Sequence, residues 1–405
     1  MIRRWLLPAG ADSTVLPLLI GKGLRAFSDG YVAVLLPAYL LALGFGTWEV
    51  GLLATATLLG SALATLAVGA WGHRFHHRNL LLGAALLMAA TGFAFATGST
   101  FWPLLVIAFV GTLNPSSGDV SLFLPLEHAR LAEAAHDEAR TALFARYSLL
   151  GALFAAFGAL AAGFPEHLVV LGGMNRLDAL RVMFVLYGLI GCTVWLLYRR
   201  LPEPIAEEQQ APMPLGASRR IVMRLAALFS VDSFAGGLVV NSLLALWLFQ
   251  RFDMSLTAAG TFFFWAGLLT AISQLLAPRL ASRIGLLNTM VFTHIPASLC
   301  LIGAAFVPSV ETALGLLLLR SLLSQMDVPA RGAFVMAVVT PGERAAAASF
   351  TAVPRSLASA ISPTLGGVMF AAGLLAAPLV ACGVLKIAYD LALWRAFRQI
   401  KASHS

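Results

Sequence analysis

Charged residues are scarce in this chain. Of its 405 residues, 11% are Asp, Glu, Lys or Arg, whereas 59% are hydrophobic. Soluble globular domains carry about 25% charged and about 45–50% apolar residues. With so little charge the chain cannot cover a core of this size with polar surface, so the excess apolar surface must face lipid. The composition excludes an ordinary soluble protein and predicts a polytopic, all-helical membrane protein.

Cysteine is rare as well, and the usual catalytic motifs are missing. Cys192, Cys300 and Cys382 sit singly in apolar runs, which is typical of inert core thiols rather than of a disulfide framework. The sequence has no Walker-type phosphate loop, no H-E-x-x-H and no G-x-S-x-G. These absences argue against an ATP-driven pump and against an intramembrane enzyme. We therefore expect no enzymatic activity, no cofactor and no metal.

Apolar segments long enough to cross a bilayer recur along the whole chain. A helix needs about 20 apolar residues to do so, and that criterion gives twelve spans. They are 15–43, 49–71, 79–98, 102–125, 142–163, 180–198, 222–249, 257–278, 286–307, 312–338, 346–370 and 375–395. The Pro-rich, Gln- and Glu-containing stretch between the sixth and seventh is typical of a solvated linker. We expect an N-terminal six-helix bundle at 1–198, a cytoplasmic linker at 199–221 and a C-terminal six-helix bundle at 222–405.

The two halves repeat one another. An offset of 204 to 209 residues aligns Phe27 with Phe234, Asn79 with Asn288, and the Asp-Val pair at Asp119 with the one at Asp327. An even number of spans in each half means that the repeats run parallel, related by an axis along the membrane normal.

The basic residues predict the orientation. If the N-terminus is cytoplasmic, the linker and the Arg-rich loops share its side, and the opposite side receives only Arg176, Arg181 and Arg251. The net charge of +8 then reflects topology and not nucleic-acid binding. We expect a monomer in the cell (inner) membrane with both termini cytoplasmic, whose partners are lipid, protons and a small-molecule substrate.

Two parallel six-helix repeats joined by a central linker resemble the major facilitator superfamily of secondary transporters. In that family the loop after the second helix reads roughly G-x-L-A-D-R-x-G-R-R/K. Here it is "GAWGHRFHHRN", which keeps Gly69, Arg74 and Arg78 but has His73 where the family has Asp; the second copy keeps Arg283. The resemblance implies transport by alternating access, with helices one, four, seven and ten around a central cavity.

A second motif bears on the direction of transport. Exporters of this family often carry G-P-x-x-G-G in the fifth helix. This chain has "GALAAG" at Gly158–Gly163, without the proline, and "SPTLGG" at the repeat-related Ser362–Gly367. The resemblance therefore favours export.

Charged residues inside the spans are the main functional signal. Each costs about 3 kcal/mol at the bilayer centre, so eleven facing lipid would cost on the order of 30 kcal/mol, more than the roughly 5–15 kcal/mol of a typical fold. They must face one another or a water-filled cavity. The candidates are Lys22, Arg25, Asp29, Asp119, Asp232, Arg320, Asp327, Arg331, Arg355, Lys386 and Asp390.

The spacing of these charges groups them into stripes. Lys22, Arg25 and Asp29 share one face of the first helix, and Arg320, Ser324, Asp327 and Arg331 share one face of the tenth. Four aspartates fall on the helices that line the cavity in the superfamily, and we predict that they couple protons, with the first as the leading candidate: Asp29, Asp119, Asp232 and Asp327. The cations Lys22, Arg25, Arg320 and Arg331 would tune these carboxylates or bind an anionic part of the substrate.

Structural ion pairs are the alternative for several of these residues. Arg25 with Asp29, Asp327 with Arg331, and Lys386 with Asp390 all have the i,i+4 spacing of a helix-bracing pair. For the last pair, in the twelfth helix, bracing is the preferred interpretation. The stretch from Glu127 to Arg140 resembles an amphipathic cytoplasmic extension of the fourth helix.

At the cytoplasmic face we expect contacts between the halves that hold one conformation closed, the alternative being charge that only sets topology. The residues are Gly69, Arg74, Arg78, Arg140, Arg283, Glu343 and Arg344. The sequence as a whole predicts a proton-coupled exporter of a drug-like or metabolite solute. The alternatives are a symporter or facilitator that imports an organic anion, and a membrane receptor that does not transport.

Overall fold

The computed structural model describes residues 7, 12–71, 74–116, 122–134, 137–202, 215–216 and 218–399. Over these residues the regular structure is helical and no strand occurs. Nine helices in the described part of the chain are long and apolar enough to cross a membrane. The expected all-α membrane fold is confirmed.

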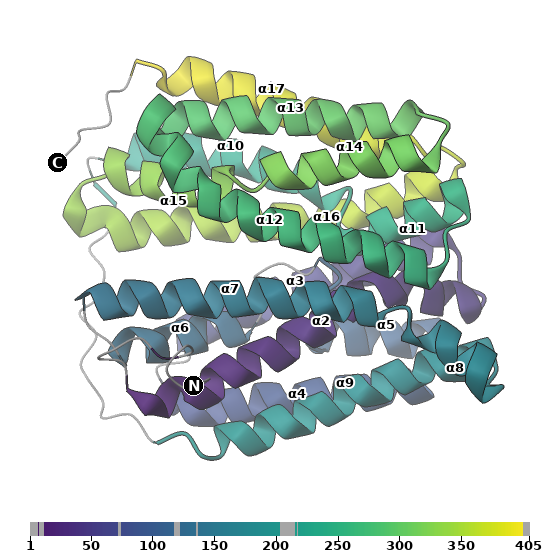
Figure 1. The fold of residues 1–405 in the computed structure, drawn as a ribbon. Coiled ribbons are helices and arrows are strands. Elements are labelled where there is room, and N and C mark those ends of the chain that lie inside the picture. The colour runs from purple at the N-terminus through teal and green to yellow at the C-terminus, as the bar shows by residue number, and fades with distance from the viewer. Residues whose placement is uncertain are drawn as a thin grey trace.

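The helices form two groups that follow one another along the chain (Figure 1). The first group consists of α2 (Leu16–Ala42), α3 (Thr47–Trp71), α4 (His77–Thr97), α5 (Phe101–Val110), α6 (Phe123–Glu133), α7 (Asp137–Ala161), α8 (Phe164–Gly172) and α9 (Arg176–Tyr198). The second consists of α10 (Arg219–Gly237), α11 (Asn241–Phe252), α12 (Leu256–Ile284), α13 (Leu286–Phe306), α14 (Val310–Leu323), α15 (Asp327–Val338), α16 (Arg344–Ala371) and α17 (Ala377–Phe397). We call these groups the N-terminal and the C-terminal half.

Each of the twelve expected spans falls on helix, but three of them are broken. The fourth is α5 followed by irregular backbone at 111–116, the seventh is divided between α10 and α11, and the tenth between α14 and α15. The expectation of continuous helices at 102–125 and 312–338 was therefore wrong. Pro115 fits the irregular backbone after α5, because proline cannot donate a helix hydrogen bond.

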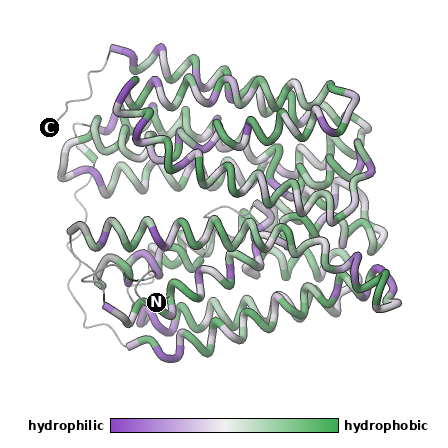
Figure 2. The backbone as a smooth tube through the Cα atoms, viewed as in Figure 1, coloured by the Kyte–Doolittle hydropathy of each residue, from purple (hydrophilic) through white to green (hydrophobic). Residues whose placement is uncertain are grey.

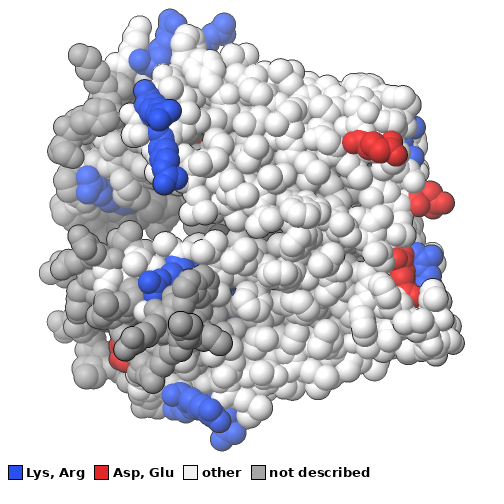
Figure 3. Space-filling model, viewed as in Figure 1, with Lys and Arg blue, Asp and Glu red and all other residues white. Residues whose placement is uncertain are grey.

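Polar and apolar residues divide the molecule into layers. Hydrophobic residues dominate the middle of the helices (Figure 2). In the view of Figure 3, most of the visible Lys and Arg gather at the end where both termini lie in Figure 1, most of the visible Asp and Glu lie at the opposite end beside a few basic groups, and the belt between is largely uncharged. We call these ends the terminal face and the distal face. An uncharged belt between two charged faces is what a bilayer requires.

The two halves meet mainly through two pairs of helices, α3 with α16 and α7 with α12, and α2 also contacts α11 and α12. In the first pair, a Cβ added to Gly51 would lie 2.5 Å from the carbonyl oxygen of Pro363 and 2.8 Å from the Cα of Gly367. Thr55 Oγ1 accepts hydrogen bonds from the backbone N–H of Thr364 at 3.0 Å and from its hydroxyl at 2.8 Å. Small residues thus let these two backbones approach closely.

The second pair is closed by a carboxylate. Glu166 on α8 accepts hydrogen bonds from the backbone N–H groups of Leu256 (2.7 Å) and Thr257 (3.0 Å), the first residues of α12. A helix N-terminus favours a negative charge there. The contacts of both pairs lie toward the distal face, and at the terminal face the surface is hollowed between the halves (Figure 3). The molecule is therefore sealed distally and open toward the termini.

The close contact at Gly51 predicts how a larger side chain there would change the conformational equilibrium. Gly51→Leu places a side chain against the backbone of α16, which cannot move aside. The substitution should therefore raise the free energy of the terminal-open conformation and not that of the other state. We expect at least a tenfold shift toward the other state, equivalent to about 1.4 kcal/mol. Spin labels at the exposed Ala70 and Ser282, one near the terminal end of each half, would report a shorter distance. Gly83→Leu is the control, because its Cβ would meet open space; equal distance distributions in both variants would contradict the prediction.

Candidate functional site

Charged side chains are buried in two clusters, one in each half. The N-terminal cluster consists of Lys22, Arg25, Asp29, Glu127, Tyr147 and Tyr198. The C-terminal cluster consists of Asp232, His294, Asp327, Arg331, Lys386 and Asp390.

A bidentate ion pair forms the centre of the N-terminal cluster. The two guanidinium nitrogens of Arg25 donate to the two carboxylate oxygens of Glu127, at 2.8 and 2.6 Å. The Tyr147 hydroxyl donates to the same carboxylate at 2.5 Å, and the Tyr198 hydroxyl also donates to it. The guanidinium lies 3.9 Å from the ring centre of Phe123. Charge-assisted, fully satisfied bonds of this kind are what makes a buried ion pair tolerable.

This pair corrects two expectations. Arg25 forms a salt bridge with Glu127, 102 residues away, a partner that the i,i+4 spacing with Asp29 did not predict. Glu127 has an exposed fraction of 0%, so α6 carries it into the bundle and is not a solvated extension at that point. The sequence signal was ambiguous, because Glu127 begins a run rich in both charge and alanine.

Asp29 faces a small polar cavity. Lys22, Arg25 and Asp29 line it together, as their spacing predicted, with Thr112 and Tyr187. Its volume of about 20 Å³ holds about one water molecule. The Lys22 ammonium lies 5.0 Å from the ring centre of Tyr147. The charged stripe of α2 therefore faces the interior of the N-terminal half.

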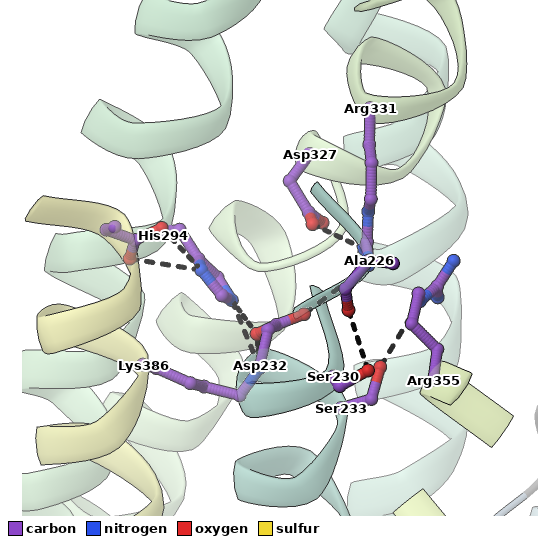
Figure 4. A network of polar contacts seen from close by, with 10 residues as sticks. Ala226, Ser230, Asp232, Ser233, His294, Asp327, Arg331, Arg355 and Lys386 are labelled. Carbon is purple, nitrogen blue, oxygen red and sulfur yellow. Dashed lines mark hydrogen bonds and ion pairs between the residues drawn. The ribbon is translucent and has the colours of Figure 1, made fainter. Parts of the chain in front are cut away.

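The C-terminal cluster is centred on Asp232 (Figure 4). Lys386 Nζ donates to its Oδ1 at 2.6 Å, and Arg331 Nη1 to its Oδ2 at 3.4 Å. The second guanidinium nitrogen of Arg331 binds Asp327 Oδ2 at 2.5 Å, which is the expected i,i+4 pair. Asp232 thus joins α10 to both α15 and α17.

His294 is the residue that the sequence reasoning missed. Its Nδ1 lies 3.1 Å from both carboxylate oxygens of Asp390. Its Nε2 lies 3.3 Å from Lys386 Nζ and 3.8 Å from Asp232 Oδ1. The expected Lys386–Asp390 pair is therefore replaced by Lys386–Asp232 and His294–Asp390. A histidine within an apolar span is itself a polar intrusion, so the sequence carried this signal, but the predicted intramembrane set contains only Asp, Lys and Arg residues.

The remaining expected site residues lie apart from these contacts. Arg320 is half-buried on α14 beside Cys300 and Cys382, and the break after Leu323 separates it from the rest of its predicted stripe. Arg355 Nε donates to Ser233 Oγ at 3.2 Å. Asp119 lies outside the described residues.

The expected gating residues gather at the terminal face. Those exposed are Gly69, Arg74, Arg140, Arg283 and Arg344. Arg78 donates to the carbonyl of Arg199 at 2.7 Å. Their contacts between the halves stay a prediction for a terminal-closed conformation.

Glu343 is held within the C-terminal half. Its carboxylate accepts hydrogen bonds from the Thr340 hydroxyl at 2.8 Å, the Ser218 backbone N–H at 3.1 Å and the Gly216 backbone N–H. The Ser218 side chain, then the Thr340 hydroxyl and the Gly216 backbone N–H, lower the pKa of Glu343 from 4.5 to about 2 by hydrogen bonding to the ionised carboxylate. The carboxylate thereby ties the end of the linker to the turn before α16.

The chain is similar to known proteins in both sequence and fold. The family model described as Major Facilitator Superfamily matches residues 18–326. An uncharacterized membrane protein of Saccharomyces cerevisiae, YJR124C, is 23% identical over 409 residues, 91% of each chain. A crystal structure of the nucleoside transporter NupG superposes with a TM-score of 0.73 at 16% identity, covering 96% of this chain and 100% of that one. A bacterial homolog of the human lysosomal transporter Spinster, inward-facing and occupied, gives 0.73 at 17%, covering 96% and 98%.

The buried pair predicts a large asymmetry between single and double variants. Arg25→Met leaves the Glu127 carboxylate unpaired, which should lower the free energy of unfolding by about 3–5 kcal/mol. Arg25→Met combined with Glu127→Met should recover most of that loss. Equilibrium unfolding in detergent micelles measures both, with the exposed Arg283→Met as control. A double variant less stable than the single one would refute the pairing.

Glu343 predicts a pH-dependent stability. Because its folded pKa lies below the unfolded one, its contribution is fully present above about pH 4.5 and is lost as pH falls through about 2. Glu343→Gln should therefore melt below wild type at pH 6, and the gap in melting temperature should narrow on acidification. The exposed Glu311→Gln is the matched control. A gap independent of pH would assign Glu343 a role other than an ionised acceptor.

Proposed function

The chain belongs to the Major Facilitator Superfamily, and from this premise we propose that it is a proton-coupled exporter of a small organic solute. Transport of small solutes follows from the family and the fold. The coupling ion and the direction are the proposal, and they rest on the arrangement of contacts and charges.

The observation that carries the proposal is the one-sided seal between the halves. Gly51 with Gly367, and Glu166 with the start of α12, join one helix of each half near the distal face. The halves separate at the terminal face. To close that face, they must rock about the middle and break the distal contacts, which is the motion of alternating access. A solute would enter the opening from the terminal side.

The charged groups support proton coupling. Asp29 is half-buried and lines a cavity large enough for about one water molecule beside Lys22 and Arg25, which supports it as a group that exchanges a proton. Asp29 remains the leading carrier. Asp232 and Asp327 bind cations here and would exchange them for protons as the helices move, and Asp119 is retained from the sequence alone. Arg25 and Arg331 then act by holding carboxylates, and Lys22 and Arg320 are retained from the sequence alone as cations that bind an anionic part of the substrate.

Orientation and direction follow from charge and motif. We place the terminal face in the cytoplasm, because its basic residues match the positive-inside rule, and the protein in the cell inner membrane as a monomer. Ser362–Gly367, the exporter-like motif, lies at the seal with α3, where Gly367 packs against Gly51. Its position at a surface that must open and close supports export.

Everted membrane vesicles test this function. With the lumen acid, an exporter should accumulate solute inside them from a panel of radiolabelled nucleosides, pentoses, organic anions and cationic dyes. Asp29→Asn should reduce gradient-driven accumulation at least tenfold while solute exchange persists. Asp253→Asn, on the exposed distal loop, is the control.

Other results would overturn parts of the proposal. Accumulation only in right-side-out vesicles under an inward proton gradient would identify an importing symporter. The absence of flux for the entire panel in either orientation would favour a receptor without transport.

A further inference from the structure

Asp390 is a wholly buried carboxylate with an unusual partner. It lies on α17 with an exposed fraction of 0%. The other two carboxylates of the C-terminal cluster each have a permanent cation: Asp327 has Arg331 at 2.5 Å, and Asp232 has Lys386 at 2.6 Å. Among the described residues, the ion-pair partner recorded for Asp390 is the imidazole of His294 at 3.1 Å.

A buried carboxylate cannot stay ionised beside a neutral imidazole at little cost. An ionised carboxylate in an apolar interior costs many kcal/mol unless it is paired, and in practice such a group binds a proton. Either Asp390 carries that proton, or His294 carries it and forms an ion pair. In both cases the two side chains together hold one titratable proton.

Lys386 determines which of the two holds it. The ammonium has three N–H donors, of which one serves Asp232, and His294 Nε2 lies 3.3 Å away. A neutral Nε2 accepts a hydrogen bond from that ammonium, which leaves the ring hydrogen on Nδ1, facing Asp390. An imidazolium would instead place two positive charges 3.3 Å apart. With Lys386 in place, the proton belongs on Asp390.

From this geometry we infer that His294 and Asp390 form a one-proton site whose occupancy is linked through Lys386 to Asp232. If Lys386 leaves His294, the ring lies between two carboxylates, Asp390 at 3.1 Å and Asp232 at 3.8 Å. The proton then moves from the Asp390 oxygen to His294, and the imidazolium replaces the ammonium as the cation at Asp232. The site thus exchanges one cation for another on α10, a helix that packs against α16 and α17.

The neighbouring charges leave this exchange intact. Arg331 and Asp327 on α15 are paired with each other, and Arg355 on α16 donates to Ser233. Arg320 on α14 lies beside Cys300 and Cys382, and the Tyr389 ring contacts the His294 ring edge-on at 6.2 Å. Figure 4 shows His294 and Lys386 approaching Asp232 from one side and Arg331 from the other.

This inference rests on the proposed proton coupling, and it gives the C-terminal half a proton site away from the central opening. The sequence favoured pure bracing for the twelfth helix because that helix is peripheral. The imidazole between Asp390 and the Lys386–Asp232 pair supplies the route by which such a helix can act on α10.

Spectroscopy without any solute tests the site. Protein labelled with ¹⁵N-histidine is placed in lipid nanodiscs at neutral pH, and His294→Asn assigns the signal. In wild type we expect a neutral ring with hydrogen on Nδ1, and one protonated carboxyl band in the infrared that Asp390→Asn removes. In Lys386→Met the same ring should carry hydrogen on both nitrogens and the carboxyl band should vanish. His128→Asn and Asp253→Asn are the matched controls.

The outcomes separate this inference from the transport function. A carboxyl band that survives Asp390→Asn, or a His294 signal that is identical in wild type and Lys386→Met, overturns the inference whatever the vesicles transport. If Lys386→Met does not fold, the inference is tested by whether the protonated carboxyl band of the wild type disappears in Asp390→Asn. Failure of the proposed function appears instead as absent flux in the wild-type vesicles, with the spectra unchanged.

Discussion

A buried charge in this molecule must find its counter-charge inside the bundle, because lipid offers none. The Arg25–Glu127 pair meets that requirement between α2 and α6. Asp232 and Arg331 meet it between α10 and α15. Arg25 and Asp232 are 207 residues apart, and Glu127 and Arg331 are 204 apart, within the offset of the internal repeat. The same two positions of each half thus hold an ion pair, with the signs exchanged.

The interface between the halves shows the same symmetry. Gly163 and Gly367, 204 residues apart, both pack across it: a Cβ on Gly163 would lie 2.7 Å from Thr257 Oγ1, and one on Gly367 would lie 2.9 Å from the Cα of Gly51. Each half contributes one glycine-containing helix to a seam near the distal face. Close backbone contact at small residues, together with the hydrogen bonds of Thr55 and Glu166, holds this seam without a buried ion pair between the halves among the salt bridges of the described residues.

Sequence reasoning predicted what is local or periodic. Apolar length predicted the spans, and i,i+4 spacing predicted Asp327 with Arg331. It failed where an ion-pair partner lies far along the chain. Local spacing suggested Asp29 as the partner of Arg25, whereas in the folded structure Arg25 forms a salt bridge with Glu127. Glu127 was assigned to solvent because a charged, alanine-rich run follows it, whereas its burial depends on how the helices pack in the bundle. The helix break at 324–326 was not predicted, because the span at 312–338 was judged by its overall apolar length although Ser324 and Gln325 interrupt the apolar run.

The Arg25–Glu127 and Asp232–Arg331 pairs differ in how many hydrogen bonds hold them, and this difference suggests a different role for each pair. Glu127 receives both nitrogens of Arg25 and two tyrosine hydroxyls, so every lone pair that faces the cluster is satisfied and rearrangement would lose several bonds together. Asp232 Oδ2 accepts a hydrogen bond from Arg331 at 3.4 Å. Its Oδ1 accepts one from Lys386 and also lies 3.8 Å from His294 Nε2. A carboxylate with two competing cations can exchange one for the other at small cost. The N-terminal pair is therefore suited to brace a rigid half, and the C-terminal cluster to change its partners when a proton binds.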